Sequence, residues 1–162
     1  MKKWKNVSLD ISYSQVNVFN TDVQDPFNDW TDTHVKQGFS WREGSVSFGA
    51  LSDWECEISV KLEEDIYENE NAIRSIIVPF YVEDNGITVA SILSEEYIFD
   101  IPKGSYELLF HAIPLESGED GLYPVRYELT FVRCATPKPR ILKYDDELSP
   151  PQEFCMEANA AI

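Results

Sequence analysis

The sequence predicts an antiparallel β-sandwich of eight or nine strands, with one short helix and an irregular C-terminal tail. Apolar and polar residues alternate along most of the chain, which is the period of a strand with one buried face. Turn-forming residues separate these alternating segments at short intervals. Only one segment carries clear helix signals.

The first half of the chain contains four alternating segments. The first two are residues 7–13 and 16–19, and residues 46–50 and 56–62 show the same alternation with a period of two. Each segment predicts a half-buried strand. The apolar positions of the first segment, which we expect to share one face, are Val7, Leu9, Ile11 and Tyr13.

The middle of the chain combines a loop, a strand and a turn. The acidic segment Glu63–Asn71 has little apolar periodicity and predicts a solvated loop. Ser75–Val82 is almost entirely apolar, but Pro79 cannot donate to a ladder, so we expect an edge position or a bulge there. Glu83–Gly86 ends in Asn-Gly, which predicts a type I′ hairpin turn into a return strand over residues 87–93.

The later strands follow the same rules. Residues 97–101 and 106–113 predict two strands separated by a turn at Pro102–Gly104, and Glu116–Gly121 predicts a flexible connection. Residues 123–132 predict the last strand of the sandwich. Its inward-facing residues are Val125, Tyr127, Leu129 and Phe131.

The best helix candidate is Asp29–Gln37. Thr31 is a suitable N-cap, and Asp32 lies in the first turn, near the positive end of the helix dipole. Gly38 is suited to the left-handed position after the last turn. We therefore expect one or two helical turns here.

The chain divides into a β-sandwich domain, residues 1–134, and a Pro-containing acidic tail, residues 135–162. Thr136–Arg140 contains two prolines and breaks regular structure. The tail is either disordered or packed along the sandwich. In the second case its apolar contacts would come from Ile141, Leu142 and Phe154.

The charge balance favours a basic partner. The 162 residues include 29 acidic and 13 basic side chains, which gives a formal net charge of −16 and a pI near 4.3. Such a surface repels phosphate and anionic lipid, so we expect neither direct nucleic-acid binding nor membrane binding. It attracts basic partners and speeds their encounter. The simpler alternative is that the acidity only maintains solubility.

The cysteines favour a reducing compartment. Their number is odd and no pair has CxxC spacing, which argues against a disulfide framework and a zinc site. No signal peptide or membrane-spanning segment is recognisable. We expect a cytoplasmic protein with reduced thiols at Cys56, Cys134 and Cys155.

No constellation for catalysis stands out. The chain has two histidines, His34 and His111, and neither has a second histidine at ligand spacing, so we expect structural roles for both and no metal or other cofactor. Paired carboxylates are frequent only because acidic residues are frequent. The sequence predicts a protein that binds rather than an enzyme.

One binding alternative comes from the tryptophans. Exposed tryptophans on a β-sandwich can stack on sugar rings, as in a carbohydrate-binding module. Most tryptophans in such folds belong to the core, and this alternative requires several of the four to be exposed. They are Trp4, Trp30, Trp41 and Trp54.

Four short blocks lie in a characteristic order and spacing between Trp4 and Val132. They are Trp4 with Leu9–Phe19, Asp29–Asp32 followed by Gly38–Phe39 and Gly44–Phe48, Val78–Val82 followed by Asn85–Ile87 and Ser91–Ile92, and Phe99–Leu108. Together they resemble the competence protein J family of DNA-entry nuclease inhibitors, and the tail after Val132 has no recognised counterpart.

The resemblance implies a non-catalytic inhibitor of a basic DNA-entry-type nuclease, in competence control or as an immunity protein beside a toxin. Carboxylates would then occupy the groove that binds phosphates. Our first candidates for the partner-binding site are Asp29, Trp30 and Asp32, although Trp30 is equally suited to plugging the core. The second candidates, for which a solvated tail is the simpler interpretation, are Asp145, Asp146 and Glu147.

Overall fold

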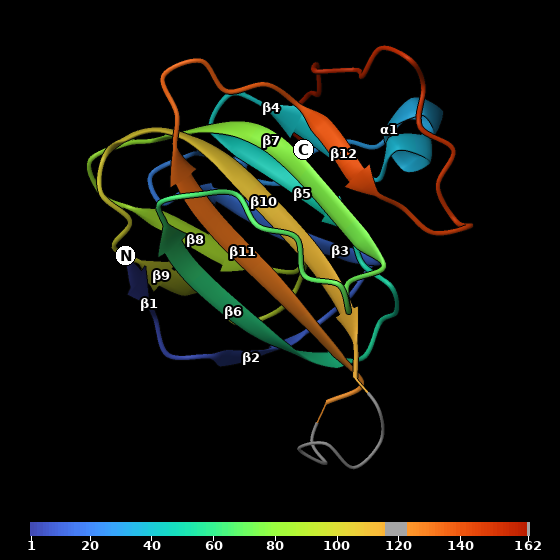
Figure 1. Ribbon diagram of the computed structural model, residues 1–162, viewed down its shortest axis with the longest axis horizontal. Coiled ribbons are helices and arrows are strands. Elements are labelled where there is room, and N and C mark those ends of the chain that lie inside the picture. Colours follow the sequence, from blue (N-terminus) through green and yellow to red (C-terminus); the bar gives the residue numbers. More distant parts are fainter. Residues whose placement is uncertain (116–122, 162) are drawn as a thin grey trace.

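The chain forms two β-sheets packed face to face with one short helix, α1, beside them (Figure 1). The computed structural model describes residues 1–115 and 123–161. One sheet contains, in spatial order, β1 (Lys2–Lys3), β6 (Glu55–Glu63), β11 (Val125–Arg133), β10 (Gly104–Pro114), β7 (Arg74–Val82) and β12 (Arg140–Lys143), with β2 (Val7–Asp10) also paired to β6. The other contains β4 (Phe39–Arg42), β5 (Ser45–Gly49), β3 (Gln15–Asn20), β8 (Ile87–Ala90) and β9 (Tyr97–Phe99).

This arrangement confirms the predicted β-sandwich. The described residues contain more strands than the eight or nine expected, because β1, β4 and β12 are short strands that the alternation did not mark. The expected flexible connection Glu116–Gly121 lies outside the described residues. No helix in residues 1–115 and 123–161 has the length and apolar character needed to cross a membrane.

Aromatic residues from both sheets fill the space between them. The ring of Phe48 in β5 stacks on that of Phe110 in β10, with centroids 4.4 Å apart and planes 2° apart. Phe110 in turn stacks on Tyr127 in β11 at 5.6 Å. The Tyr127 hydroxyl accepts a hydrogen bond from the Leu51 amide at 2.8 Å, so its polar end is satisfied inside the core. The predicted inward face of β11 is confirmed.

The seven-stranded sheet contains one parallel pair, which corrects the purely antiparallel prediction. β6 runs parallel to β11, with Ile58 opposite Tyr127. The β6–β7 connection crosses β11 and β10 on the outer face of the sheet, as the green segment of Figure 1 shows. Because β7 pairs with β10 rather than with β6, the chain must make this crossover.

The predicted hairpin at Glu83–Gly86 is wrong. β7 pairs with β10 and β12, whereas β8 pairs with β3 and β9 in the opposite sheet. Gly86 has φ of +73°, but Asn85 does not share the positive φ that a type I′ turn needs at both central residues. The Asn-Gly signal marks a turn correctly, but the pairing of the flanking strands depends on residues distant in the sequence.

Pro79 occupies an edge, as predicted. β12 pairs with β7 only as far as Ile77, so the far side of β7 at Pro79 has no strand beside it. The Pro79 carbonyl accepts a 2.7 Å hydrogen bond from the indole of Trp41 in the other sheet. A residue that cannot donate to a ladder therefore lies where no strand needs its N–H.

The expected strand position of Tyr13 is wrong. β2 ends at Asp10, and Tyr13 lies in a turn between Ser12 and Gln15 with φ of +54°. Its side chain is 68% exposed, while Leu9 and Ile11 are buried. The alternation of residues 7–11 simply stops before Tyr13, and sequence periodicity alone does not mark that end.

Gly86 offers a test of this architecture, because a Cβ there would lie 2.4 Å from the Phe99 carbonyl of β9. Gly44 is the matched control, since it also has positive φ but leaves room for a Cβ. Gly44→Ala should lower the free energy of unfolding by about 1–2 kcal/mol through the left-handed backbone alone. Gly86→Ala should lose at least about 1 kcal/mol more through the clash. Denaturant unfolding measures both, and equal losses would contradict the close approach of Gly86 to β9.

Candidate functional site

Helix α1 (Asp32–Gln37) is short but capped at both ends. The Thr31 hydroxyl accepts from the His34 amide, and the His34 imidazole accepts from the Thr31 amide, which completes a capping box. Gly38 follows in the left-handed conformation with φ of +87° and donates to the His34 carbonyl. The helix and its caps were predicted correctly, except that the helix begins at Asp32 rather than Asp29.

His34 joins the helix to the end of the chain. Its Nδ1 accepts from the Thr31 amide, so the ring proton is on Nε2, which donates to the Glu157 carbonyl at 2.9 Å. The ring is buried and lies edge-on to that of Trp30, with centroids 6.4 Å apart. His34 therefore has a structural role, as the sequence predicted.

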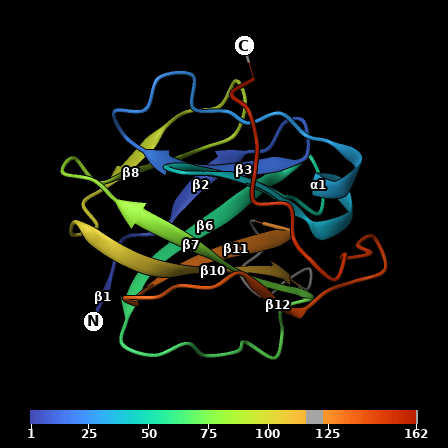
Figure 2. The same cartoon turned by 90° about the horizontal axis from the view of Figure 1, so that it is seen from above.

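The C-terminal segment packs against α1 and does not extend into solvent (Figure 2). The Gln37 side-chain Nε2 donates to the Cys155 backbone carbonyl, and the Gln37 Oε1 accepts from the Cys155 backbone amide, both at 3.0 Å. The Asp29 backbone amide donates to the Asn159 carbonyl, and the Asp29 carboxylate accepts from the Asn159 backbone amide. Of the two alternatives for the tail, the structure shows packing along the sandwich.

A buried arginine fixes the tail beside the sheets. Arg74, the first residue of β7, is 3% exposed and binds Asp145 with both Nε and Nη2, at 2.7 and 3.2 Å. Its Nη1 donates to the Gly49 carbonyl of β5 at 2.9 Å. Its Nη2 also forms an ion pair with the Glu147 Oε1 at 3.5 Å. Arg74 thus connects both sheets and the tail.

A second ion pair holds the start of the tail. The Arg140 guanidinium binds the Glu107 carboxylate at 2.6 and 3.1 Å, and the Lys138 amide donates to the same carboxylate. The hydrogen bond from Arg140 lowers the pKa of Glu107 and outweighs the opposing effect of burial. This pair places β12 at the edge of the sheet.

These contacts enclose one side of a cavity of about 430 Å³. Glu147 and Leu148 of the tail face it from one side, and Trp30 and Val35 face it from the side of α1. Its other lining residues are Tyr13, Ser14, Gln15, Gly38, Gly49, Ala50, Leu51 and Arg74. The Trp30 Nε1 is buried without a hydrogen-bond partner.

The structure places the first predicted group of site residues around this cavity in different ways. Trp30 is half-buried and lines the cavity. Asp32 is exposed in the first turn of α1. Asp29 is half-buried and its carboxylate already accepts from Asn159.

Of the second predicted group, only Glu147 lines the same cavity. Asp145 is largely buried against Arg74, while Asp146 is exposed. The Glu147 side chain lines the cavity and is 68% exposed. Two segments that are more than a hundred residues apart in the sequence therefore meet at one cavity, through Trp30 and Glu147.

Sequence reasoning missed Arg74 and Tyr13 as parts of this site. Arg74 directly precedes a continuous apolar run, and a cation at the start of a buried strand needs a carboxylate partner. That rule predicts that Arg74 has a partner but does not identify it among the 29 acidic residues. Nothing in the pattern identified Tyr13.

The two sheets differ in their cations. Residues 6–35, 43–60 and 75–102 contain no lysine or arginine, but each range contains several acidic residues. Arg42 is the single lysine or arginine in the strands of the five-stranded sheet, and its side chain binds the Asn28 amide oxygen and the Asp25 carbonyl. The strands of the five-stranded sheet contain no acidic residue, so the carboxylates on this side of the molecule lie on the connecting loops and on α1.

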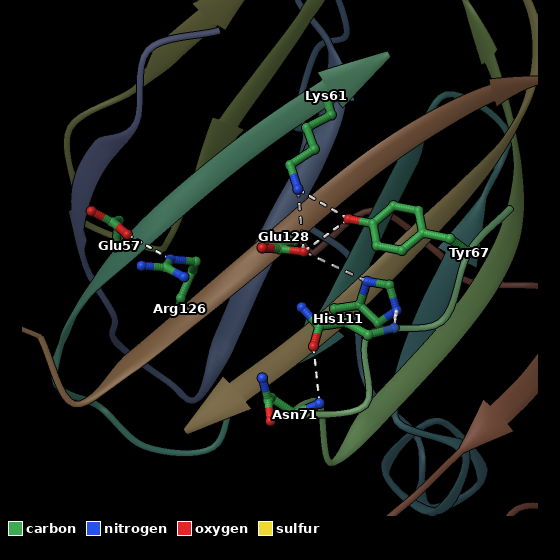
Figure 3. A network of polar contacts seen from close by, with 8 residues as sticks. Glu57, Lys61, Tyr67, Asn71, His111, Arg126 and Glu128 are labelled. Carbon is green, nitrogen blue, oxygen red and sulfur yellow. Dashed lines mark hydrogen bonds and ion pairs between the residues drawn. The ribbon is translucent and has the colours of Figure 1, made fainter. Parts of the chain in front are cut away.

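A separate polar network lies on the outer face of the seven-stranded sheet (Figure 3). Lys61, Tyr67 and Glu128 contact one another at 3.0 to 3.6 Å, and His111 Nδ1 lies 3.9 Å from Glu128. His111 Nε2 accepts from the Asn69 amide.

Burial in this network lowers the pKa of His111, partly opposed by the charge of Glu128, so the ring stays neutral near pH 7. Tyr67 and Asn69 belong to the crossover connection that covers the sheet. The predicted solvated loop is therefore attached to the sheet at these two residues. The network has a structural role, which agrees with the expectation for His111.

The described residues offer no donor set for a metal ion. Within residues 1–115 and 123–161, no three His, Cys, Asp or Glu side chains form a cluster that could hold one. The cavity is instead lined mainly by apolar side chains, together with Arg74 and the single carboxylate of Glu147. Apolar walls with a few polar groups are typical of binding pockets.

Comparisons with known proteins give one family. The profile of the competence protein J (ComJ) family matches residues 8–132. The DNA-entry nuclease inhibitor of Bacillus subtilis (strain 168) is 36% identical over 119 residues, which are 74% of this chain and 89% of that protein.

Solved structures agree with this result. The crystal structure of ComJ from Bacillus subtilis, described as an inhibitor of the DNA degrading activity of NucA, matches with a TM-score of 0.73 and 33% identity, covering 82% of this chain and 98% of that one. A crocagin biosynthetic protein J matches with a TM-score of 0.50 and 14% identity, covering 80% and 98%, which shows a shared fold. The family match includes Trp30 and α1 and ends before the tail residues at the cavity.

Removing the Asp145 carboxylate should leave Arg74 buried without its main partner. We expect Asp145→Asn to lower the free energy of unfolding by about 3 kcal/mol. Asp146→Asn is the matched control, because Asp146 is exposed, and it should change the free energy by less than about 0.5 kcal/mol. Similar values for the two variants in denaturant unfolding would show that Arg74 does not depend on Asp145.

The Glu107–Arg140 pair should make stability depend on pH. Because the pKa of Glu107 is lower in the folded chain, its ionised form contributes stability above the ordinary glutamate pKa, and this contribution disappears as the pH falls through the folded pKa. Wild type should exceed Glu107→Gln in unfolding free energy at neutral pH, and the difference should shrink below a pH of about 4. A difference independent of pH would argue against the ion pair.

Proposed function

The chain belongs to the competence protein J family, and from this membership we propose that it binds and inhibits a bacterial DNA-entry-type nuclease. The observation that carries the proposal is the family match over residues 8–132, together with the inhibitory function named for its Bacillus subtilis relative. Under this proposal the chain performs no catalysis itself. It acts by occupying the nuclease.

We further propose that the nuclease presents a basic DNA-binding groove to the acidic side of the sandwich. The net charge of −16 and the scarcity of cations around the five-stranded sheet support this orientation. Carboxylates placed where phosphates would lie compete directly with DNA. Complementary charge also speeds association and makes it sensitive to salt.

The cavity between α1 and the tail is the proposed centre of contact. Asp32, Asp146 and Glu147 have exposed carboxylates, although that of Glu147 also lies 3.5 Å from Arg74, and Trp30 contributes its half-buried ring. Asp29 and Asp145 are proposed to act indirectly, since their carboxylates hold the C-terminal segment in place.

The sugar-binding alternative finds little support. It required several exposed tryptophans, but among the four only Trp54 is exposed, at 63%. Trp41 binds Pro79 across the sandwich and Trp4 binds Asp100, so both indoles have partners within the chain.

The proposal also retains a cytoplasmic location, which the three unpaired cysteines favour.

The test is a titration of the nuclease encoded nearest this gene, with DNA degradation as the readout. Stoichiometric inhibition is expected, and it should weaken from about 0.1 M to about 1 M salt as the Debye length falls from about 10 to 3 Å. Failure to inhibit, with no complex on gel filtration, would overturn the proposed function. Inhibition that salt does not change would instead overturn the carboxylate mechanism.

Charge reversal at the cavity separates local contact from net charge. Asp32→Lys with Asp146→Lys should weaken inhibition about tenfold at low salt, because two steering carboxylates become repulsive cations. Glu64→Lys with Asp65→Lys is the matched control, since both residues are exposed on the crossover connection and the change in net charge is identical. Equal effects of the two double variants would mean that net charge, and not this face, determines binding.

A further inference from the structure

Three large hydrophobic side chains stand exposed on neighbouring loops at one end of the sandwich. Tyr13 is 68% exposed, Trp54 63% and Leu93 89%. They lie on three connections: the turn before β3, the β5–β6 loop and the β8–β9 loop. Side chains of this size in water contribute nothing to the stability of the free chain.

Hydrogen bonds tie these three connections together. The Ser12 amide donates to the Ser91 hydroxyl at 2.9 Å, which joins the turn to the β8–β9 loop. The Ser14 amide and hydroxyl both donate to the Asp53 carboxylate, at 2.7 and 3.1 Å, which joins the turn to the β5–β6 loop next to Trp54. The loops therefore form one rigid unit.

The backbone of this unit is strained. Tyr13, Ser14 and Leu93 have φ of +54°, +52° and +64°, and Asp25 is the one other non-glycine residue with positive φ among the described residues. A side chain makes the left-handed backbone unfavourable, and glycine or asparagine would avoid most of that cost. Two bulky hydrophobic residues thus occupy positions where the fold alone favours small or polar ones.

Strain maintained by a hydrogen-bond network, with large apolar groups held out into solvent, is typical of a preorganised binding surface. Tyrosine and tryptophan are the residues that most often carry the binding energy of protein interfaces. The unit is also continuous with the candidate site, because Tyr13 and Ser14 line the same cavity as Trp30 and Glu147.

The charges around the unit indicate the chemistry of its partner. All three side chains lie in the ranges without lysine or arginine, and exposed carboxylates flank them in the sequence. Aromatic rings next to carboxylates suit arginine and lysine, whose cationic heads pair with carboxylates or lie over a ring while their stems pack on apolar surface. The nearby exposed carboxylates are Asp10, Asp53, Glu55, Glu95 and Glu96.

We propose that Tyr13, Trp54 and Leu93 form an apolar anchor that packs against arginine and lysine side chains of the nuclease's DNA-binding surface. This inference rests on the proposed function and names the part of the chain that holds the complex together. The anchor supplies burial that salt does not screen, whereas the surrounding carboxylates supply the attraction that salt does screen.

Two single substitutions each remove one of the three anchor side chains without disturbing the backbone. Tyr13→Gly and Leu93→Asn both suit a left-handed φ, so neither variant should unfold more easily than wild type. Leu142→Thr is the matched control, because Leu142 is an exposed hydrophobic residue on β12 of the seven-stranded sheet, outside the three loops. Each variant is titrated into the nuclease encoded nearest this gene, at about 0.1 M and about 1 M salt.

Tyr13→Gly should weaken inhibition at least about tenfold, which is about 1.4 kcal/mol of binding free energy. The factor should be similar at both salt concentrations, unlike that of the charge reversals, and Leu93→Asn should act in the same direction. Leu142→Thr should inhibit like wild type.

The outcomes separate this inference from the proposed function. If wild type does not inhibit, the proposed function fails and the anchor with it. If wild type inhibits and the folded Tyr13→Gly and Leu93→Asn variants inhibit equally well, only the anchor is overturned. The anchor is likewise overturned if the two substitutions abolish self-association on gel filtration while inhibition is unchanged, since the surface would then bind a second copy of the chain.

Discussion

A guanidinium buried in a β-sandwich must be neutralised and fully hydrogen-bonded, and Arg74 meets this constraint by joining three parts of the chain. It begins β7 in one sheet, donates to the Gly49 carbonyl of the other sheet, and binds the Asp145 carboxylate of the C-terminal segment. The tail is therefore a structural partner of the sandwich. Leu148, three residues after Asp145, packs against Gly38 so closely that a Cβ on Gly38 would lie 2.9 Å from it. The ion pair therefore holds the part of the tail that lines the cavity directly beside the end of α1.

The ion pairs also use some of the few cations of this acidic chain within the fold. Arg74 and Arg140 both bind carboxylates on the seven-stranded sheet side, so these cations are already paired within the fold. The strands of the five-stranded sheet have only Arg42, which is bound to Asn28 and Asp25. These strands therefore contain no further lysine or arginine that could balance the carboxylates of the neighbouring loops. A field of this kind affects association and solubility and does not determine the fold.

Much of the fold follows from local signals, and the exceptions have a common cause. The helix cap at Thr31, the left-handed Gly38 and the inward face of β11 each depend on residues within a few positions, and all were predicted correctly. The Asn85–Gly86 turn was predicted correctly as a turn but not in its strand pairing, because β8 is held by β3 and β9. For the site, the sequence selected Trp30 and Glu147 but not their meeting at one cavity, since that depends on Arg74 and on contacts across the whole chain.

Tyr13 shows why a functional surface is hardest to predict from one sequence. Its place in an alternating pattern indicated burial, and only the turn at Ser12–Gln15 reveals that its ring faces solvent. An inhibitor must both reach its target quickly and stay bound, and these demands select different residues. Long-range attraction by carboxylates determines the association rate, whereas rigid apolar anchors determine how slowly the complex separates. Under the proposed function, the exposed side chains of Tyr13 and Leu93 would meet the second demand, and the exposed carboxylates on the same loops would meet the first.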